Sequence, residues 1–368
     1  MNEGGKYVLM AAVLVCIATT NTSCVHSEWL KHIDAGTAAF KQGQYVEAEK
    51  SYSAALKEAE KVGPQYPDVA TSLGCLGTLY KAQGKYAEAE PLLKRSLQIR
   101  EKALGPNHAD VADSLNHLAA LYHSQGKYAE AEPLFKRSLQ IREKALGPNH
   151  PYVAESLNNL AELYQSQRKY AEAEPLLKRS LQINEKALGP NHPDVATSLN
   201  NLAELYDFQR KYTEAEPLLK RSLQISEKAL GANHPDVATS LNNLAELYKA
   251  QGKYAEAEPL LKRSLQISEK ALGPNHPDVA TSLSNLALLY EAQGKYSEAE
   301  PLYKRSLQIK ENALGANHPD VASSLEHYAG FLRKTNRKAE ASKLDTRAKA
   351  IRKAQKSVSN DNGTTGGG

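Results

Sequence analysis

Cysteine, tryptophan and methionine are scarce in this chain of 368 residues, which holds 3 Cys, 1 Trp and 2 Met. Cys16, Cys24 and Cys75 cannot form a disulfide framework, so stability must come from packed apolar side chains. The formal net charge of +4 is small for this length.

The sequence also lacks the common motifs of catalysis. It contains no glycine-rich phosphate loop, no His-Glu-x-x-His and no nucleophile elbow. Its many Asp and Glu residues stand at periodic positions that we expect to be exposed, so no two of them form an evident acid and base. The sequence therefore predicts no enzyme, no cofactor and no small-molecule substrate.

What the chain does have is a repeat of 42 residues, marked by two tyrosines in each unit. The first row is Tyr80, Tyr122, Tyr164, Tyr206, Tyr248 and Tyr290. The second row is Tyr86, Tyr128, Tyr170, Tyr212, Tyr254 and Tyr296. A period of this size is typical of a unit that cannot bury its apolar face alone and stacks on copies of itself.

Each unit predicts two antiparallel helices. In the unit that starts at Asp194, apolar residues recur at spacings of three and four in two successive runs, as in amphipathic helices. Gly231 suits the end of the second helix and Pro235 the first turn of the next. Pro217 stands early in the second helix, where a missing amide has little or no partner, so we expect the helix to continue through it.

These residues resemble the tetratricopeptide repeat family, whose 34-residue pattern runs from a large residue through Leu-Gly or Leu-Ala, Tyr and Gly-x-Tyr to Ala. The corresponding places are filled by Leu241, Leu244-Ala245, Tyr248, Gly252-Lys253-Tyr254 and Ala257. The 42-residue period is similar to that of kinesin light chains, whose second helix is longer by about two turns. The resemblance implies an all-α fold, a right-handed α-solenoid of about eight tetratricopeptide (TPR) helical hairpins.

The resemblance divides the chain into five segments. Residues 28–67 resemble a leading hairpin, 68–319 hold six near-identical units, and 320–356 resemble a closing hairpin that caps the solenoid. Residues 357–368 are rich in Ser, Asn, Gly and Thr and are expected to be disordered. Residues 1–24 do not belong to the repeats.

Residues 1–24 have the pattern of an export signal. The apolar run Tyr7–Ala18 is too short to span a bilayer comfortably, and small and polar residues lead from it to Cys24. This resembles a bacterial lipoprotein signal with Cys24 as the lipidated residue, although Asn21 replaces the usual Leu. Three alternatives stay open: a lipoprotein, an exported protein cleaved elsewhere, and an uncleaved or cytoplasmic protein.

One histidine recurs at the same loop position: His108, His150, His192, His234, His276 and His318. Packed helices stand about 8–10 Å apart, so equivalent side chains cannot approach one metal ion at ligand distances of about 2 Å. We therefore expect no metal site, and we expect each imidazole to bond the backbone of its turn.

The units differ most clearly at the end of the first helix. The varied pair reads Lys81-Ala82, His123-Ser124, Gln165-Ser166, Asp207-Phe208, Lys249-Ala250 and Glu291-Ala292. The resemblance implies that the first helix lines a concave groove and that these positions face into it. A constant frame with a varied lining suits recognition of a partner; drift at exposed positions is the alternative.

Two more uniform rows run beside this pair. They are Asn116, Asn158, Asn200 and Asn242 and, one turn on, Glu162, Glu204 and Glu246. An amide side chain offers both a donor and an acceptor, so the Asn row can hold the backbone of an extended peptide irrespective of its sequence. The alternative is that the asparagines are merely surface-exposed. The predicted partner-binding groove comprises these rows with Gln165, Asp207, Phe208, Lys249 and Glu291.

The leading hypothesis is an exported, non-enzymatic scaffold that binds a peptide or partner protein in this groove. Its glutamates favour basic or neutral peptides over an acidic carboxylate tail. A second hypothesis is binding to nucleic acid or a membrane surface through residues 333–356, which are rich in Lys and Arg but also suit a soluble end cap. A third is a structural component of an envelope assembly.

Overall fold

The structure is a computed structural model that describes residues 25–361, with side chains described as far as residue 354. The predicted export signal, including Cys24, lies outside the described residues. Between residues 25 and 361 the chain consists of helices joined by short turns and contains no strand. None of the helices in this range combines the length and the apolar character needed to cross a membrane.

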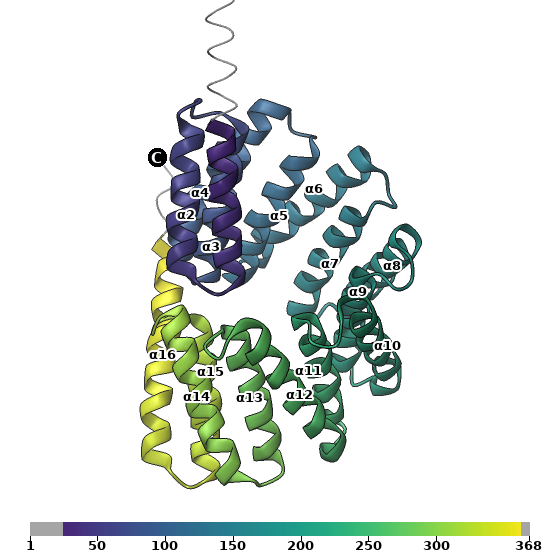
Figure 1. Ribbon diagram of the computed structural model, residues 1–368, viewed down its shortest axis with the longest axis vertical. Helices are drawn as coiled ribbons and strands as arrows, with labels where there is room; N and C mark the ends of the chain where they lie inside the picture. The colour runs from purple at the N-terminus through teal and green to yellow at the C-terminus, as the bar shows by residue number, and fades with distance from the viewer. Residues whose placement is uncertain (1–24, 362–368) are drawn as a thin grey trace, which may run out of the picture. The chain divides into compact units, whose positions relative to one another are not determined.

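The helices alternate between a shorter and a longer type (Figure 1). We call the odd-numbered helices from α3 to α15 the A helices, of 16 residues, and the even-numbered helices from α4 to α14 the B helices, of 19. A helix over residues 25–41 comes first. It is followed by α2 (Tyr45–Glu60), α3 (Pro67–Ala82), α4 (Tyr86–Leu104), α5 (Ala109–Ser124), α6 (Tyr128–Leu146), α7 (Pro151–Ser166), α8 (Tyr170–Leu188), α9 (Pro193–Phe208), α10 (Tyr212–Leu230), α11 (Pro235–Ala250), α12 (Tyr254–Leu272), α13 (Pro277–Ala292), α14 (Tyr296–Leu314), α15 (Pro319–Lys334) and α16 (Lys338–Asp361).

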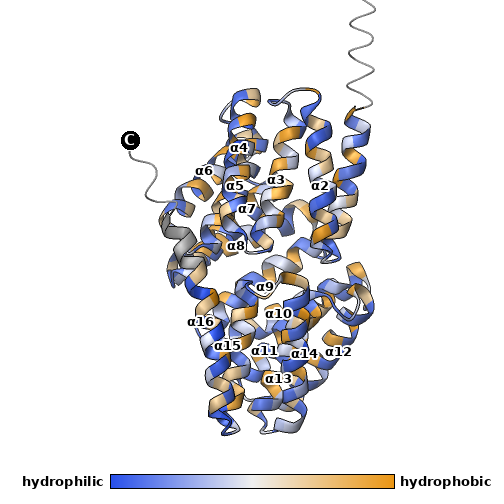
Figure 2. Ribbon diagram, turned by 90° about the vertical axis from the view of Figure 1, so that its left-hand side faces the viewer, coloured by the Kyte–Doolittle hydropathy of each residue, from blue (hydrophilic) through white to orange (hydrophobic). Residues whose placement is uncertain are grey.

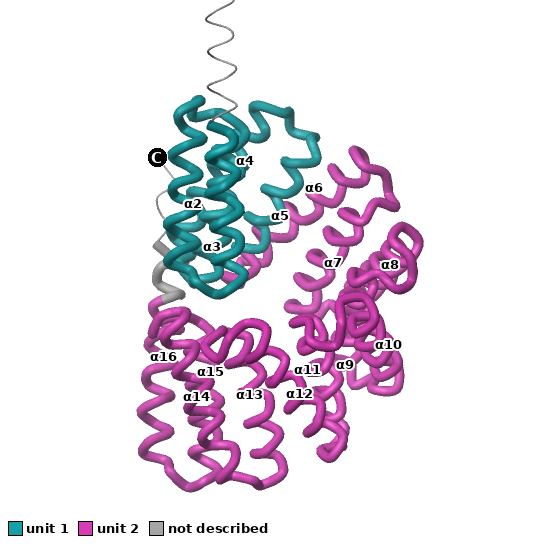
Figure 3. Tube along the Cα trace, viewed as in Figure 1, with its two compact units in different colours: residues 1–121 teal, residues 122–368 magenta. Residues whose placement is uncertain are grey.

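The chain divides into two compact units, with the boundary between Leu121 and Tyr122 inside α5 (Figure 3). In the first unit, α3 packs against both α2 and α4. In the second unit, every helix from α6 to α16 packs against the next one along the chain. Each unit is therefore a stack of helical hairpins in which neighbours in sequence are neighbours in space.

The A helices of the second unit lie on the inner side of a local bend. Contacts join α7 to α9, α9 to α11 and α11 to α13, whereas no B helix in the described part of the chain makes contacts of this extent with the next B helix. Helices that touch along one side and separate along the other must curve toward the touching side. The exposed face of the A helices is therefore the concave face of this unit.

Leucine and alanine side chains form most of the core between hairpins. Figure 2 shows hydrophobic and hydrophilic residues mixed along every helix, as expected for amphipathic helices. Ala203 of α9, Ala215 and Leu219 of α10, and Leu244 and Leu247 of α11 form one buried cluster. This cluster joins three consecutive helices, so each hairpin is completed by the next one. Truncating one of these leucines to alanine removes about 2–5 kcal/mol of stability in comparable cores.

The loops confirm three expectations. His192 Nδ1 accepts a hydrogen bond from the backbone N–H of Asp194 at 3.2 Å, and the same bond occurs at the other five loop histidines. Gly231 ends α10 with φ of +90°, a conformation that favours glycine. The helix α10 continues through Pro217, as expected for a proline near a helix start.

The last helix is longer than expected. It continues to Asp361, beyond the boundary at residue 356, so the start of the segment predicted to be disordered is helical. Ala341, Ala348 and Ile351 are buried and anchor α16 to the end of the stack. The prediction of disorder rested on composition, and the helix anchored by these residues continues past them into residues 357–361.

Arginine occupies a left-handed conformation in two of the A-to-B turns. Arg168 and Arg210 have φ of 60° and 57°, where Gly126 and Gly252 of the flanking units have 72° and 73°. A residue with a Cβ atom is strained there by roughly 1–2 kcal/mol, whereas glycine is not.

We therefore expect Arg210→Gly to raise the free energy of unfolding by about 1 kcal/mol. Gly252→Arg at the matched position should lower it by a similar amount. Urea denaturation followed by circular dichroism measures both. Equal stabilities of the two variants and the parent would contradict the assigned turn conformation.

Candidate functional site

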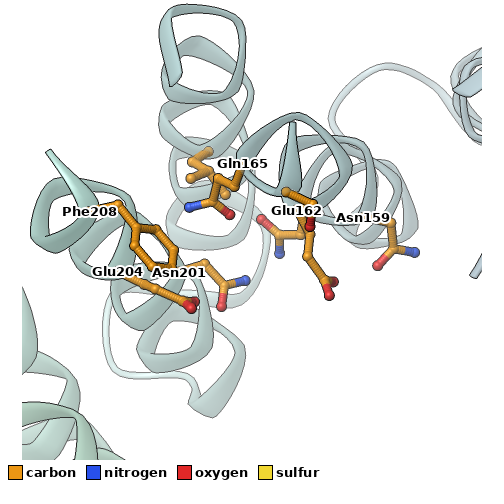
Figure 4. A pocket seen from close by; sticks show the side chains of 9 residues that line it. Asn159, Glu162, Gln165, Asn201, Glu204 and Phe208 are labelled. Atoms are coloured by element: carbon orange, nitrogen blue, oxygen red, sulfur yellow. The ribbon is translucent and has the colours of Figure 1, made fainter. Parts of the chain in front are cut away.

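A polar cavity of 280 Å³ lies between α7 and α9 on the concave face of the second unit (Figure 4). Its lining comprises Asn158, Asn159, Glu162, Gln165, Ser166, Leu177, Asn201, Glu204 and Phe208. Positions 158, 162 and 165 follow the spacing of one helix face, so α7 presents them side by side. The predicted groove residues Asn158, Glu162, Gln165, Glu204 and Phe208 thus meet in one cavity.

Two further cavities continue this one along α9 and α11. One, also of 280 Å³, shares Glu204 and Phe208 with the first and adds, among others, Asn200, Asp207 and Glu246. The other, of 210 Å³, lies toward the start of the helices, where Asn200 and Asn201 also line it. We call the surface of α7, α9 and α11 that these three cavities share the A-face groove.

The carboxylates of the A-face groove lie close enough to repel one another. Partial desolvation by the surrounding helices raises the pKa of Glu204, although the residue stays exposed at the surface, and the charges of Glu162 and Asp207 raise it further. The pKa of Asp207 is raised by burial and by Glu246, with Lys249 opposing. The fold therefore holds these side chains where their charged forms are less favourable than in water.

One cation lies among them. Lys249 forms an ion pair with Glu246 on the same helix, α11. Glu162 lies 3.9 Å from His123 Nδ1, a contact that carries charge only when the histidine is protonated. Glu204 has no ion-pair partner among residues 25–354. The α7–α9 end of the groove is therefore its most negative part.

Several polar atoms of the groove form no hydrogen bond within the described protein. Buried atoms without a hydrogen-bond partner in the described protein include Asn158 Oδ1, Asn200 Oδ1, Gln165 Nε2, Asp207 Oδ1 and Glu246 Oε1. An unsatisfied buried polar group costs about 1–3 kcal/mol. Such atoms also occur outside the groove, for example at Gln83, Gln125 and Gln293; those in the groove line cavities and are therefore available to a ligand.

Three predicted groove residues have other surroundings. Asn116 belongs to the first unit and is 5% exposed. Glu291 is 9% exposed; it accepts a hydrogen bond from Tyr303 Oη at 2.6 Å and pairs with Lys334 Nζ at 2.6 Å. Asn242 Nδ2 donates to Ser282 Oγ at 3.4 Å across α11 and α13. Burial keeps Asn116 and Glu291 from contacting a partner, so their assignment to the groove is corrected.

A second asparagine column was missed. Asn159, Asn201 and Asn243 all line cavities of the A-face groove. Each is the second residue of the Asn-Asn pair in the phrase Ser-Leu-Asn-Asn-Leu. Adjacent helical residues point about 100° apart, so both members of a pair can border a wide groove. The Asn-Asn pair in the sequence was the signal from which this second column could have been predicted.

The first unit has a pocket of different chemistry. This pocket has a volume of 210 Å³, and its lining comprises Phe40, Tyr52, Thr71, Gly74, Cys75, Thr78, Arg100 and His117. No carboxylate borders it, and the positions of Asn158, Asn159 and Glu162 are filled by Gly74, Cys75 and Thr78. Burial raises the pKa of the Cys75 thiol to about 11, so it stays protonated and is a poor nucleophile.

Much of the basic C-terminal segment is bound to the end of the stack. The recorded ion pairs join Arg333 to Asp345, Lys334 to Glu291, Arg337 to Glu300, Arg347 to Glu311 and Arg352 to Glu326. These contacts agree with an end cap and leave fewer free cations for an anionic surface. Within residues 25–354, no three Asp, Glu, His or Cys side chains converge on a possible metal ion.

Comparison with known proteins places the chain in a family. The tetratricopeptide repeat model matches residues 31–102, 68–144, 110–186, 152–228, 208–270, 236–312 and 278–354. The chain therefore belongs to the tetratricopeptide repeat family, and its fold is an all-α solenoid of such repeats. No curated protein matches the sequence.

Solved structures are similar over different lengths. The nearly identical TPR-like repeats of a Podosopora anserina protein assigned as a kinesin light chain are 32% identical, over 56% of this chain and 97% of that one, with a TM-score of 0.46. A tetratricopeptide repeat protein from Parabacteroides merdae is 21% identical over 78% and 98% of the two chains, with a TM-score of 0.50. The apo form of RapI is 14% identical over 90% and 99%, with a TM-score of 0.53.

The family model itself names the tetratricopeptide repeat, and its seven matches together span residues 31–354. The last two neighbours show the fold alone. Tetratricopeptide repeat proteins are generally scaffolds for protein–protein interaction, and this chain is one of them.

The electrostatics predict that Glu204 opposes folding slightly at neutral pH, because the residue is exposed and solvent screens most of the repulsion. A folded-state pKa above the ordinary value means that stability is full below the ordinary pKa and is lost as pH rises through the folded value. We expect Glu204→Gln to raise the urea midpoint at pH 7, with the gain vanishing near pH 4.

Glu216→Gln is the matched control. A hydrogen bond from Lys220 lowers the pKa of Glu216, so its contribution is present above the ordinary pKa and is lost as pH falls. This variant should lose stability at pH 7. Destabilisation by both variants at pH 7 would show that Glu204 is a structural residue.

Proposed function

We propose that this chain is a non-enzymatic scaffold that binds an extended peptide, free or within a partner protein, in the A-face groove. The main supporting observation is a run of three cavities that share lining residues and whose amide and carboxylate side chains include several atoms without a hydrogen-bond partner in the described protein. Amide side chains can donate to a peptide carbonyl and accept from a peptide N–H. Such contacts hold a backbone whatever its sequence.

The size of the groove sets the length of peptide that it holds. Packed helices are about 8–10 Å apart, so α7, α9 and α11 together present roughly 20 Å of surface. An extended chain advances about 3.3 Å per residue, which corresponds to about six residues. The proposal therefore concerns a short segment.

The charge of the groove selects among peptides. Glu162, Glu204 and Asp207 crowd the α7–α9 end, and the nearby Lys249 is already paired. An acidic carboxylate tail would add a like charge to a cluster whose members already repel one another. Basic and neutral peptides are the favoured partners.

Removing amide contacts tests the groove. The triple variant Asn158→Ala, Asn200→Ala, Asn201→Ala should weaken peptide binding by about fivefold for each hydrogen bond lost, since one bond contributes about 1 kcal/mol. Titration calorimetry with an end-capped hexapeptide library measures the affinity. Asn191→Ala and Asn233→Ala, in exposed loops, serve as controls. Unchanged affinity in the triple variant would rule out the groove.

We also propose that residues 1–24 direct export and that Cys24 carries the lipid. The proposal rests on the apolar run Tyr7–Ala18 and the small and polar residues that separate it from the cysteine. Its alternatives are export with cleavage elsewhere and retention in the cytoplasm.

Labelling of expressing bacteria with an alkyne fatty acid tests the lipid. The full chain should incorporate label and fractionate with membranes, and Cys24→Ala should lose both properties. Cys75→Ala is the control and should behave as the parent does. Label that persists in Cys24→Ala would contradict lipidation at this residue.

A further inference from the structure

We propose that the cavity between α7 and α9 is a pocket for one arginine side chain of the bound peptide. This inference rests on the proposed function and adds to it a position-specific preference. The pocket is formed by the Phe208 ring, the carboxylates of Glu162 and Glu204, and the amides of Gln165 and Asn201.

The aromatic wall is the first reason. Phe208 is 53% exposed, although a large apolar side chain gains by burial. One side of its ring stacks on Tyr170, with centroids 6.3 Å apart and planes 12° from parallel, which fixes the ring orientation. The equivalent residues in the other five repeat units are all small: Ala82, Ser124, Ser166, Ala250 and Ala292.

The carboxylates are the second reason. Glu204 lies beside the Phe208 ring, and Glu162 faces the same cavity from α7 (Figure 4). Their charges act on each other, as the raised pKa of Glu204 shows, and Glu204 has no ion-pair partner among residues 25–354. A cation between them would relieve this repulsion and form charge-assisted hydrogen bonds.

The shape of the cavity argues for an organic cation. No three carboxylates converge closely enough in the described part of the chain to hold a metal ion. The volume of 280 Å³ lies just below the range of about 300–1,000 Å³ typical of small-ligand pockets, which suits one long side chain. Asn201 adds an amide oxygen that can accept from a multi-donor group.

A guanidinium fits better than an ammonium. It is planar, stacks on aromatic faces and can bond a carboxylate through two parallel N–H groups. The lysine ammonium carries the same charge in a compact group. It cannot stack flat on a ring, and it cannot form two parallel hydrogen bonds with one carboxylate. The neighbouring unit lacks this combination, because Ala250 replaces the ring and Lys249 already pairs with Glu246.

Four pools of fluorescein-labelled, end-capped hexapeptides test the pocket. The pools are identical except at the third position, which holds arginine, lysine, citrulline or glutamate. Fluorescence anisotropy with the purified protein should show the arginine pool binding about tenfold tighter than its neutral isostere citrulline, with lysine between them. Phe208→Ala and Glu204→Gln should bring arginine and citrulline within twofold.

Glu214→Gln, on an exposed position of α10 away from the cavity, is the control and should keep the full preference. Circular dichroism confirms that each variant is folded. Equal binding of the arginine and citrulline pools to the parent protein would overturn the pocket and leave the groove intact. If none of the four pools binds, both the pocket and the proposed function fail.

Discussion

Packing between consecutive hairpins is the interaction on which the whole molecule depends. No hairpin can enclose its own apolar side chains, so Ala203, Ala215 and Leu219 are covered only when α11 adds Leu244 and Leu247. The alanines are fully buried, and their small size lets the helices approach closely. Because this core uses one face of each A helix, the opposite face is free to vary without loss of the fold.

That freedom explains where the functional chemistry lies. Contacts between successive A helices bend the second unit locally and bring their polar faces together. The result is a groove that crowds Glu204, Asp207 and Glu246 and leaves amide atoms without partners in the described protein. Repulsion between the carboxylates and unpaired amide atoms contribute nothing to folding, which is consistent with a surface adapted to a ligand. In the first unit, the equivalent positions hold Gly74, Cys75 and Thr78, so this unit lacks the amides and the carboxylate found there in α7.

Most of the fold follows from the repeat. The apolar spacing predicts both helices of each unit, and the turn chemistry of Gly231, Pro235 and the loop histidines is visible in sequence because it is local. The groove could be predicted only in part. Glu291 is buried because α14 carries Tyr303 where preceding B helices carry Leu or Phe, and because Lys334 reaches it from α15. Such contacts involve residues of three helices at once, and the repeat pattern of the sequence cannot predict them.

The central claim is that the exposed face of the A helices, and no other surface, receives the partner. Photo-crosslinking tests it most directly: a bound hexapeptide carrying a benzophenone is irradiated, and the attachment sites are located by mass spectrometry. The account predicts attachment to α7, α9 and α11, near Asn201 and Phe208. Attachment confined to the B helices or to α16 would contradict it.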